Sequence, residues 1–557
     1  MLNFLKNNRV VSAALLATIL GGGVTMASIS SESILARTKI LSSDEFEGRS
    51  PGSAGEDKTV EYLIHEFKTI GLQPGNPDGT YLQNVPLVGI TSNVDATFDA
   101  GSETISFQPM TEFTASSPRL KEMVEVKASD MVFVGYGVVA PEYQWDDYKG
   151  VDVRGKTLLM LVNDPPVIDP ATGKLDPEVF KGNAMTYYGR WTYKYDIAAK
   201  MGAAACLVIH ETGPAGYPFA VLGSGWGREG FDLVTPDRNE SRAAVEGWVT
   251  ASALQRLLAA SGQNFETLKA AAVRRDFKPV SLEAKATFSV KNTLREVASK
   301  NVLAKFEGAD PAHRDEYVIY TAHWDHLGRD PRLNGDQIYN GAADNAAGVA
   351  VLLEIAEAFV ELPPKERPKR SILFLAVTAE EKGLLGSRYY AQNPLYPLNQ
   401  TLAAINMDGA NQFGPTRDMT TIGFGASTID DIGMAVAASQ GREMKPEIHP
   451  EHGYYYRSDH FEFAKVGVPA YYAKAGALFV GQPVDFGEKL IQDYLANRYH
   501  KVGDEVQPSW TFEGAAQDTE FLLKIGLEIA NASTWPQWRE GNEFKARRDG
   551  MMKASVR

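Results

Sequence analysis

The chain has 557 residues, and a typical domain size of about 150 residues indicates two to four domains. Its 44% hydrophobic and 23% charged residues are typical of a globular protein and exclude wholesale disorder, a collagen-like repeat and a coiled coil. The net charge of −14 argues against a general nucleic-acid-binding protein, because recognition of the phosphate backbone uses a basic excess. The single cysteine, Cys206, excludes an internal disulfide and a cysteine metal cluster, so any metal must be held mainly by histidines and carboxylates.

The first 27 residues have the pattern of a signal peptide. Lys6 and Arg9 precede an apolar run over residues 10–20, and three glycines and a stretch of small residues follow it. A membrane-spanning helix needs about 20 apolar residues, so this run is too short to serve as an anchor. We therefore expect cleavage of residues 1–27, a periplasmic or extracellular location and no stable membrane anchor afterwards.

Two different patterns follow the signal segment. Residues 60–70 place Val60, Leu63 and Phe67 on one face of a predicted helix that stops at Gly71. From residue 123 to 279 the chain changes to short β-like runs, such as 131–134 and 157–162, separated by turns and joined by one helix-like stretch before Ala203. This middle block is predicted to be a separate, β-rich insertion, with Cys206 in a core strand.

The third block, residues 289–535, alternates apolar strands with amphipathic helices. The predicted strands are 317–322, 371–378 and 401–405, and the predicted helices are 346–361, about 386–392 and about 513–532. Such alternation predicts an α/β fold, with a mixed, largely parallel sheet and helices on both faces. Residues 541–557 are basic, and the part from Lys545 onward lacks periodicity, so we expect a solvated tail.

Each predicted strand of this block runs into histidine or carboxylate residues, at the edge where open α/β sheets bind ligands. The first strand leads to His323 and Asp325, a spacing at which the carboxylate can accept a ring N–H of a metal-bound imidazole, although such pairs are also ordinary polar contacts. The second leads to Glu380 and Glu381. These two are either a solvated helix start or a metal ligand beside a proton acceptor.

Three further segments supply groups of the same kind. Asp408 follows the third strand, where an aspartate is often only a turn residue. Asp344 lies in a loop of small residues before the helix at 346–361; it either caps that helix or, because its neighbours are small, approaches two cations. Near the end of the block, His500 lies beside Tyr499, whose hydroxyl can hydrogen-bond a developing oxyanion.

Taken in their order along the chain, with Asp344 between His323 and Glu380, the five motifs resemble the series found in the co-catalytic di-zinc exopeptidases. That family includes secreted bacterial aminopeptidases, glutamate carboxypeptidase and, as an inactive member, the transferrin receptor. The middle block resembles the protease-associated domain that many relatives carry as an insertion. The resemblance implies a discontinuous zinc peptidase domain over residues 30–120 and 289–540, interrupted by a protease-associated domain over residues 123–279.

The resemblance also implies a role for each residue. Asp344 would bridge two zinc ions, with His323 and Asp408 completing one site and Glu381 and His500 the other. Cobalt or manganese would be accepted as substitutes. The remaining implied roles are a general base for Glu380, a partner of the His323 ring for Asp325 and an oxyanion stabiliser for Tyr499. In relatives the peptide bond after the bridging aspartate is cis, which predicts a cis bond between Asp344 and Asn345.

The other histidines have weaker patterns. His460 lies in a Ser-Asp-His segment that many relatives have near the substrate pocket, and it rivals His500 for the last ligand position; the Tyr-His-x-x-x-Asp pattern favours His500. His326 is expected to orient its loop, and His449 and His452 are interpreted as structural or surface residues.

The function that the resemblance implies is an aminopeptidase that removes N-terminal residues from peptides by means of water activated at the two metals. Three alternatives remain. A carboxypeptidase of the glutamate-carboxypeptidase type would need arginines for the substrate carboxylate, for which Arg457 and Arg498 are candidates. A receptor-like homologue would lack the metals, but all five expected ligands and the base are present. A glutaminyl cyclase would use one zinc, and the presence of Asp344 with both Glu380 and Glu381 argues against it. The preferred side chain and the oligomeric state stay open.

Overall fold

The protein is described by a computed structural model that covers residues 29–555 with the exception of Ser224. The predicted signal peptide, residues 1–27, lies outside the described residues and stays a prediction. None of the helices in the described part is both long enough and apolar enough to cross a membrane.

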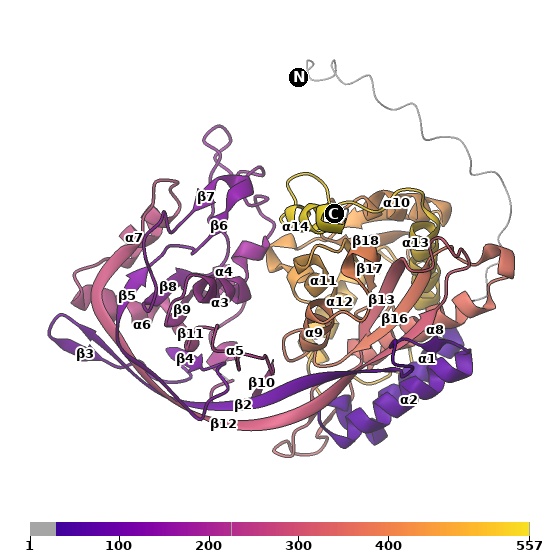
Figure 1. Ribbon diagram of the computed structural model, residues 1–557, viewed down its shortest axis with the longest axis horizontal. Coiled ribbons are helices and arrows are strands. Elements are labelled where there is room, and N and C mark those ends of the chain that lie inside the picture. Colours follow the sequence, from indigo (N-terminus) through magenta and orange to yellow (C-terminus); the bar gives the residue numbers. More distant parts are fainter. Residues whose placement is uncertain (1–28, 224, 556–557) are drawn as a thin grey trace.

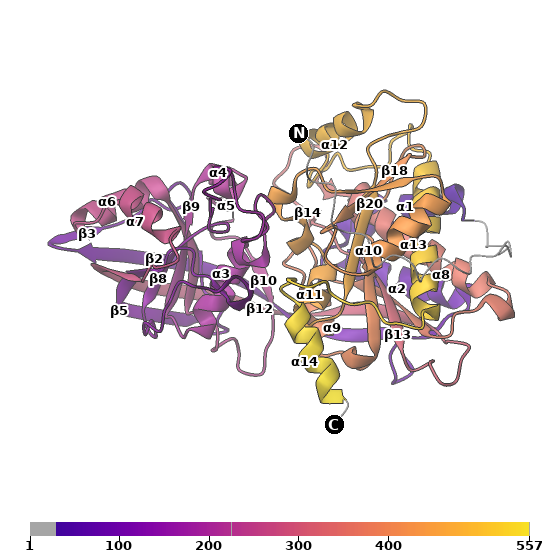
Figure 2. The same cartoon turned by 90° about the horizontal axis from the view of Figure 1, so that it is seen from above.

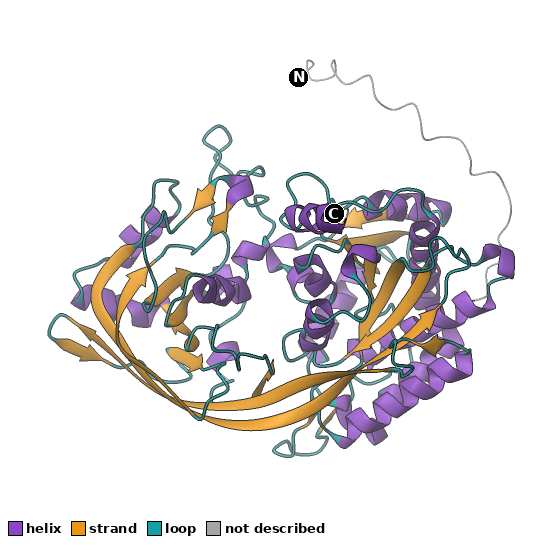
Figure 3. Cartoon of the chain, in the orientation of Figure 1, coloured by secondary structure: helices purple, strands orange, loops and turns teal. Residues whose placement is uncertain are grey.

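Two units lie side by side and share one pair of long strands, β2 (Leu82–Ala100) and β12 (Val280–Phe306), which runs beneath both (Figure 1). We call residues 29–90 and 295–555 the larger unit and residues 91–294 the smaller unit. Strands β2 and β12 pair antiparallel along their lengths. The beginning of β12 also pairs with β5, in the smaller unit, whereas its end pairs with β16, in the larger unit. One continuous strand therefore belongs to both sheets, which Figure 3 shows as two groups of strands.

The sheet of the larger unit has the strand order β19-β18-β20-β17-β13-β16-β12. Strands β16, β13, β17 and β20 run parallel to one another, while β12 runs antiparallel to β16 and β18 runs antiparallel to β20. The bounds are β13 (Tyr317–His323), β16 (Ser371–Val377), β17 (Thr401–Asn406), β18 (Asp418–Ile422), β19 (Glu443–Pro446) and β20 (Ala470–Ala475).

Helices cover both faces of this sheet, as alternate residues of β13 demonstrate. Val318 and Tyr320 belong to a core that includes residues of α1, α2, α8 and α13. Ile319 points the other way, into a core that includes residues of α9 and α11. The predicted mixed, largely parallel sheet with helices on both faces is confirmed. The bounds of the helices are α1 (Ser31–Leu41), α2 (Ala54–Ile70), α8 (Ala347–Glu361), α9 (Leu385–Gln392), α11 (His460–Lys465) and α13 (Glu513–Asn531).

The predicted helix before Gly71 is confirmed as α2, and both of its ends have a local cause. Ser53 precedes it and accepts a hydrogen bond from the backbone N–H of Glu56, which satisfies one free donor at the helix start. Gly71 ends it with φ 94°, a left-handed conformation that suits glycine because it has no Cβ.

The smaller unit has its own core and a sheet in the order β12-β5-β8-β9-β11-β4. Cys206 is buried in β9, as predicted. The helix expected before Ala203 is α3, but the sequence analysis did not predict α6 and α7, which pack against this core as well. The core also includes Val94 and Phe113, which precede the predicted start of the insertion at residue 123. The bounds are β4 (Phe113–Ser116), β5 (Met123–Phe133), β8 (Thr157–Leu161), β9 (Ala205–His210), β11 (Val245–Thr250), α3 (Trp191–Lys200), α6 (Ala251–Ala260) and α7 (Phe265–Ala272).

Short elements and peripheral helices complete both units; in the view from above, α12 lies at the edge of the larger unit (Figure 2). They are β1 (Gln73–Pro74), β3 (Glu103–Ile105), β6 (Val139–Ala140), β7 (Trp145–Asp146), α4 (Thr212–Ala215), α5 (Ala220–Gly223), β10 (Gly230–Leu233), β14 (Gly328–Arg329), β15 (Ile338–Tyr339), α10 (Ile429–Ser439), α12 (Phe486–Asn497) and α14 (Lys545–Ser555).

The prediction of a solvated tail is wrong for the described part of the C-terminal segment. Residues 545–555 form α14, and Arg548 within it is only 2% exposed. The Arg548 guanidinium donates hydrogen bonds to the carbonyl oxygens of Leu398 and Thr401, at 3.0 and 2.8 Å. A single buried arginine that binds backbone carbonyls leaves no apolar periodicity, which is why the sequence pattern did not reveal this packing.

Candidate metal centre

The carboxyl ends of three neighbouring parallel strands bring the predicted site residues to one edge of the sheet. His323 is the last residue of β13, Glu380 and Glu381 follow β16 in a turn, and Asp408 lies two residues beyond β17. Strands β16 and β17 flank β13 on either side and run parallel to it. Their ends therefore converge, as is usual for ligand sites in open α/β sheets.

The five predicted metal ligands form one cluster around Asp344. His323 Nε2 lies 3.3 Å from Asp344 Oδ1 and 3.7 Å from Asp408 Oδ1. On the other side, His500 Nε2 lies 3.3 Å from Asp344 Oδ2 and 3.1 Å from Glu381 Oε2. The two oxygens of Asp344 thus face two different histidines, which is the arrangement expected of a bridging carboxylate.

His326 also lies in this cluster. It is fully buried, and its Nδ1 lies 2.7 Å from Glu381 Oε1. Its potential ligand atom lies within 4.8 Å of those of Asp344 and Glu381, and the ligand atoms of His323, Glu380 and Asp408 are grouped in the same way. From the sequence, His326 is predicted only to orient its loop. Its position three residues after His323 is the signal that could have placed it here.

Asp504 holds the loop that carries Asp344. Its carboxylate accepts hydrogen bonds at 3.1 Å from the backbone N–H groups of Ala343 and Asp344, and its carbonyl oxygen accepts one from Ala342 at 2.9 Å. Burial raises the pKa of Asp504 to about 6, although these N–H donors favour the charged form. In the sequence, Asp504 is only the last residue of the motif around His500, and no role is predicted for it.

Asn345 connects the ends of β13 and β17 behind the cluster. The peptide bond between Asp344 and Asn345 is cis, as the resemblance implied. The Asn345 amide donates to the carbonyl oxygens of His323, at 3.3 Å, and Met407, at 3.1 Å, and its oxygen accepts from the Gly409 N–H at 2.7 Å. The loop of Asp344 is therefore tied to the ends of β13 and β17, two of the three strands that lead to candidate ligands.

Arg49 also supports the loops beside the cluster through hydrogen bonds to their backbone. It lies in a segment that the sequence analysis did not connect with the site, and it is 1% exposed. Burial lowers its pKa to about 10, while nearby carboxylates, Asp325 and Asp504 first among them, oppose this shift, so the guanidinium is charged at neutral pH. It donates to four backbone carbonyl oxygens, those of Leu41, Trp324, Asn340 and Gly341, at 2.6, 2.9, 2.7 and 2.9 Å.

The contacts of Asp325 differ from those expected. His323 Nδ1 lies 3.1 Å from the backbone carbonyl oxygen of Asp325 but 3.8 Å from its carboxylate. The Asp325 carboxylate instead accepts the backbone N–H of Glu380 at 3.0 Å. Burial raises the pKa of Asp325 to about 6. The carboxylate predicted to hold the His323 ring therefore holds the turn that carries Glu380, and the backbone at Asp325 faces the ring.

The adjacent carboxylates Glu380 and Glu381 have opposite pKa shifts. Burial raises the pKa of Glu380 well above its usual range; His323 opposes the shift, and Glu381 adds to it. Burial acts on Glu381 too, but His326 and His500 outweigh it and hold the Glu381 pKa well below its usual range. Paired groups whose environments separate their pKa values are typical of acid–base sites.

The pKa values of two histidines, His323 and His500, are raised by the neighbouring carboxylates. Burial lowers the pKa of His323, but Glu380, Asp344 and Asp408 outweigh it and raise the pKa well above its usual value. For His500, Asp344 and Glu381 outweigh burial and raise the pKa to about 10. Four acidic side chains thus lie together at a buried position, an arrangement that calls for positive charge. Because the donors are imidazole and carboxylate groups, the cluster fits zinc.

Tyr499 lies directly against the cluster. Its ring stacks on His500 with a centroid distance of 3.9 Å, and burial raises the pKa of its hydroxyl far above neutral pH. The hydroxyl therefore keeps its proton and can act as a hydrogen-bond donor. Its role towards an oxyanion stays a prediction.

His460, the rival ligand, is packed between the rings of Tyr455 and Tyr472, at centroid distances of 4.6 and 4.9 Å. Burial lowers the pKa of His460 to about 3. His500, rather than His460, lies against Asp344 and Glu381.

Parts of the chain are similar to known peptidases. Residues 301–522 match the model of peptidase family M28. A stretch of 133 residues is 39% identical to Aminopeptidase NAALADL1 of Mus musculus, covering 23% of this chain and 16% of that protein. Over 359 residues the chain is 26% identical to the probable leucine aminopeptidase 2 of Aspergillus oryzae, covering 64% of this chain and 54% of that protein. In both cases the match covers less than two thirds of the relative.

Among solved structures, the fold is similar to that of the aminopeptidase from Aneurinibacillus sp. strain AM-1. The identity is 20%, the TM-score is 0.47, and the match covers 91% of this chain and 96% of that chain.

Proposed function

We propose that the chain, whose residues 301–522 match the model of peptidase family M28, is a zinc-dependent aminopeptidase that removes N-terminal residues from peptides. The observation that carries the proposal is Asp344, whose two carboxylate oxygens face His323 on one side and His500 on the other. The signal-like pattern of residues 1–27 supports action in the periplasm or outside the cell.

The residues around Asp344 divide into two sets of metal ligands. His323, Asp344 and Asp408 would hold one zinc ion, and Asp344, Glu381 and His500 the other; cobalt or manganese would fit the same donors. When bound, a pair of such ions polarises a carbonyl group and lowers the pKa of a water molecule. His326, which lies 2.7 Å from Glu381, would hold that carboxylate in place.

Glu380 is the group that moves the proton. Its carboxylate is grouped with the ligand atoms of His323 and Asp408, and its raised pKa suits a base that accepts a proton from the attacking water and gives it to the leaving amine. Asp325 fixes the turn that carries Glu380 through the hydrogen bond to its backbone N–H. Tyr499, protonated at neutral pH, would donate a hydrogen bond to the oxyanion.

A carboxypeptidase is the second candidate; the position of Arg457 favours it, whereas that of Arg498 does not. Arg498 pairs with Asp493 at 3.1 Å, which occupies one of the two arginines expected to bind a substrate carboxylate. Arg457, in contrast, lies near Arg190 of the smaller unit: burial and then the charge of Arg457 lower the pKa of Arg190 to about 10. Two neighbouring arginines at the junction of the units are suited to a terminal carboxylate.

Metal content and turnover of aminoacyl anilides test the aminopeptidase proposal. The wild type should contain at least two zinc ions per chain. Glu380→Gln should keep this content and lower kcat by about 10²- to 10⁴-fold, because the proton acceptor is lost. Glu361→Gln, a change at an exposed glutamate of α8, is the matched control and should equal the wild type. Zinc content near zero, or full turnover by Glu380→Gln, would contradict the proposal.

Peptides with blocked ends separate the two exopeptidases. An aminopeptidase should lose activity when the substrate N-terminus is acetylated and keep it when the C-terminus is amidated. A carboxypeptidase should show the opposite pattern, and its KM should rise when Arg457 is replaced by Ala.

A further inference from the structure

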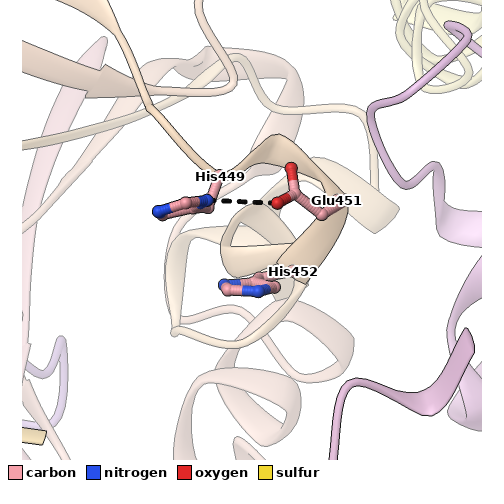
Figure 4. A group of neighbouring side chains, drawn as sticks. All are labelled: His449, Glu451 and His452. Atoms are coloured by element: carbon pink, nitrogen blue, oxygen red, sulfur yellow. Dashed lines mark hydrogen bonds and ion pairs between the residues drawn. The ribbon is translucent and has the colours of Figure 1, made fainter. Parts of the chain in front are cut away.

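A second group of potential metal ligands lies away from the candidate metal centre, on a loop of the larger unit. His449, Glu451 and His452 are brought together by the short 3-10 helix η7 (Pro450–His452), as Figure 4 shows. Residues three apart lie above one another in such a turn, and the two histidine rings stack at a centroid distance of 5.1 Å. Glu451 Oε1 lies 3.1 Å from His449 Nδ1.

We propose that His449, Glu451 and His452 bind one divalent transition-metal ion, with zinc as the best fit. The three residues each offer a ligand atom, and these atoms lie within 4.8 Å of one another. Zinc bonds of about 2.0–2.2 Å place ligand atoms about 3.4 Å apart, so the His449–Glu451 pair is already close enough and His452 needs a side-chain rotation. Two imidazoles with one carboxylate favour zinc over calcium or magnesium, which prefer oxygen ligands.

The smaller unit holds this loop in position. The backbone N–H of Met185 donates to the Pro450 carbonyl oxygen at 3.1 Å. The Asn183 amide donates to Glu451 Oε2 at 3.2 Å, which leaves Oε1 turned towards His449. Such hydrogen bonds orient the carboxylate ligands of metal sites. An ion bound here would therefore also stiffen the junction between the two units.

An ordinary ion pair between His449 and Glu451 is the competing explanation, and replacement of His452 distinguishes it from a metal site. An ion pair binds no metal and needs no third group, so replacing His452 would then leave the zinc content of the protein unchanged. A metal site needs all three ligands, so replacing His452 should remove an ion just as replacing His449 does.

Zinc counting on full-length protein without a histidine tag tests the proposal. After dialysis against a buffer that fixes the free zinc concentration, the variants His449→Ala and His452→Ala should each contain one zinc ion fewer per chain than the wild type. The matched control is His313→Ala, because His313 Nδ1 also faces a glutamate, Glu316, at 3.2 Å, but has no third ligand in the groups found among the described residues. It should equal the wild type, and equal zinc content in all four proteins would overturn the proposal.

A second variant keeps the test decisive if an alanine variant folds poorly. Glu451→Gln is nearly isosteric with the native residue and should weaken zinc binding at this site about 10- to 100-fold. Zinc should slow limited proteolysis at residues 181–186 in the wild type and in His313→Ala but not in Glu451→Gln; equal protection would contradict the site. Turnover of peptides is measured in parallel. Because the zinc count is a difference between variants, it does not depend on whether the candidate metal centre has the proposed activity.

Discussion

Asp504 accepts the backbone N–H of Asp344 at 3.1 Å, and Asp344 is the residue whose carboxylate faces both His323 and His500. The buried Asp504 carboxylate thereby holds the backbone of Asp344, whose two carboxylate oxygens point towards different histidines. The adjacent Ala343 N–H donates to the same carboxylate. The loop has only small side chains around Asp344, so these hydrogen bonds, rather than packing, set its conformation.

Asp504→Asn should weaken the binding of zinc about 10- to 100-fold, because an amide offers one acceptor oxygen where the carboxylate offers two. The measurement is a zinc titration of the metal-free protein. Turnover should fall at low zinc and recover at high zinc, since the ligands themselves are intact. Glu505→Gln, at the neighbouring exposed position, is the control. Zinc affinity that is the same in Asp504→Asn and the wild type would show that Asp504 does not position Asp344.

Arg49→Lys should lower the thermal stability of the larger unit. A lysine keeps the charge, but its ammonium has three donors and cannot match the planar guanidinium that binds four carbonyl oxygens. Each buried carbonyl left without a donor costs about 1–3 kcal/mol, so Tm should fall by several degrees. Differential scanning calorimetry measures the shift. Arg329→Lys, at an exposed position, is the control, and a Tm shift no larger than that of the control would refute the role of Arg49.

Arg548→Ala should destabilise the protein by about 3 kcal/mol, because the guanidinium is buried and donates to the carbonyl oxygens of Leu398 and Thr401. The adjacent Arg547 is exposed on the same helix, so Arg547→Ala is a closely matched control. Urea unfolding of both variants measures the difference. If the two changes have the same effect, the C-terminal helix contributes as little as a solvated tail would.

Asp147 should make stability depend on pH. It is buried, accepts hydrogen bonds from the Val138 N–H and the Trp145 indole, and burial raises its pKa from 3.8 to about 6. Between these values the folded state binds the proton more tightly than the unfolded state. The stabilisation from the protonated group is therefore complete below pH 3.8 and is lost as the pH rises to about 6.

The variant Asp147→Asn has no such proton, so its free energy of unfolding should rise relative to that of the wild type by about 3 kcal/mol between pH 4 and pH 7. Urea unfolding at several pH values measures this difference. A constant difference between the two proteins over this range would show that Asp147 is ionised in the folded state throughout.

The sequence by itself determined the alternation of strands and helices and the residues that end the strands. The carboxyl ends of parallel strands meet at one edge of a sheet, so the pattern predicted that His323, Glu381 and Asp408 lie at that edge. Their direct proximity depends on β13 lying between β16 and β17, which only the fold decides. For Asp344 the pattern left both a helix cap and an approach to cations open, and the resemblance implied its bridging position.

Only the tertiary structure decided which distant segments support the site. Arg49 binds the Asn340 carbonyl oxygen across 291 residues of sequence, and the loop at His449 is held by Asn183 and Met185 of the other unit. Contacts of this kind go largely to backbone groups, which every residue has, so no side-chain pattern marks the partner. The division of β12 between two sheets has the same cause, since strand pairing depends on backbone groups brought together by the whole fold.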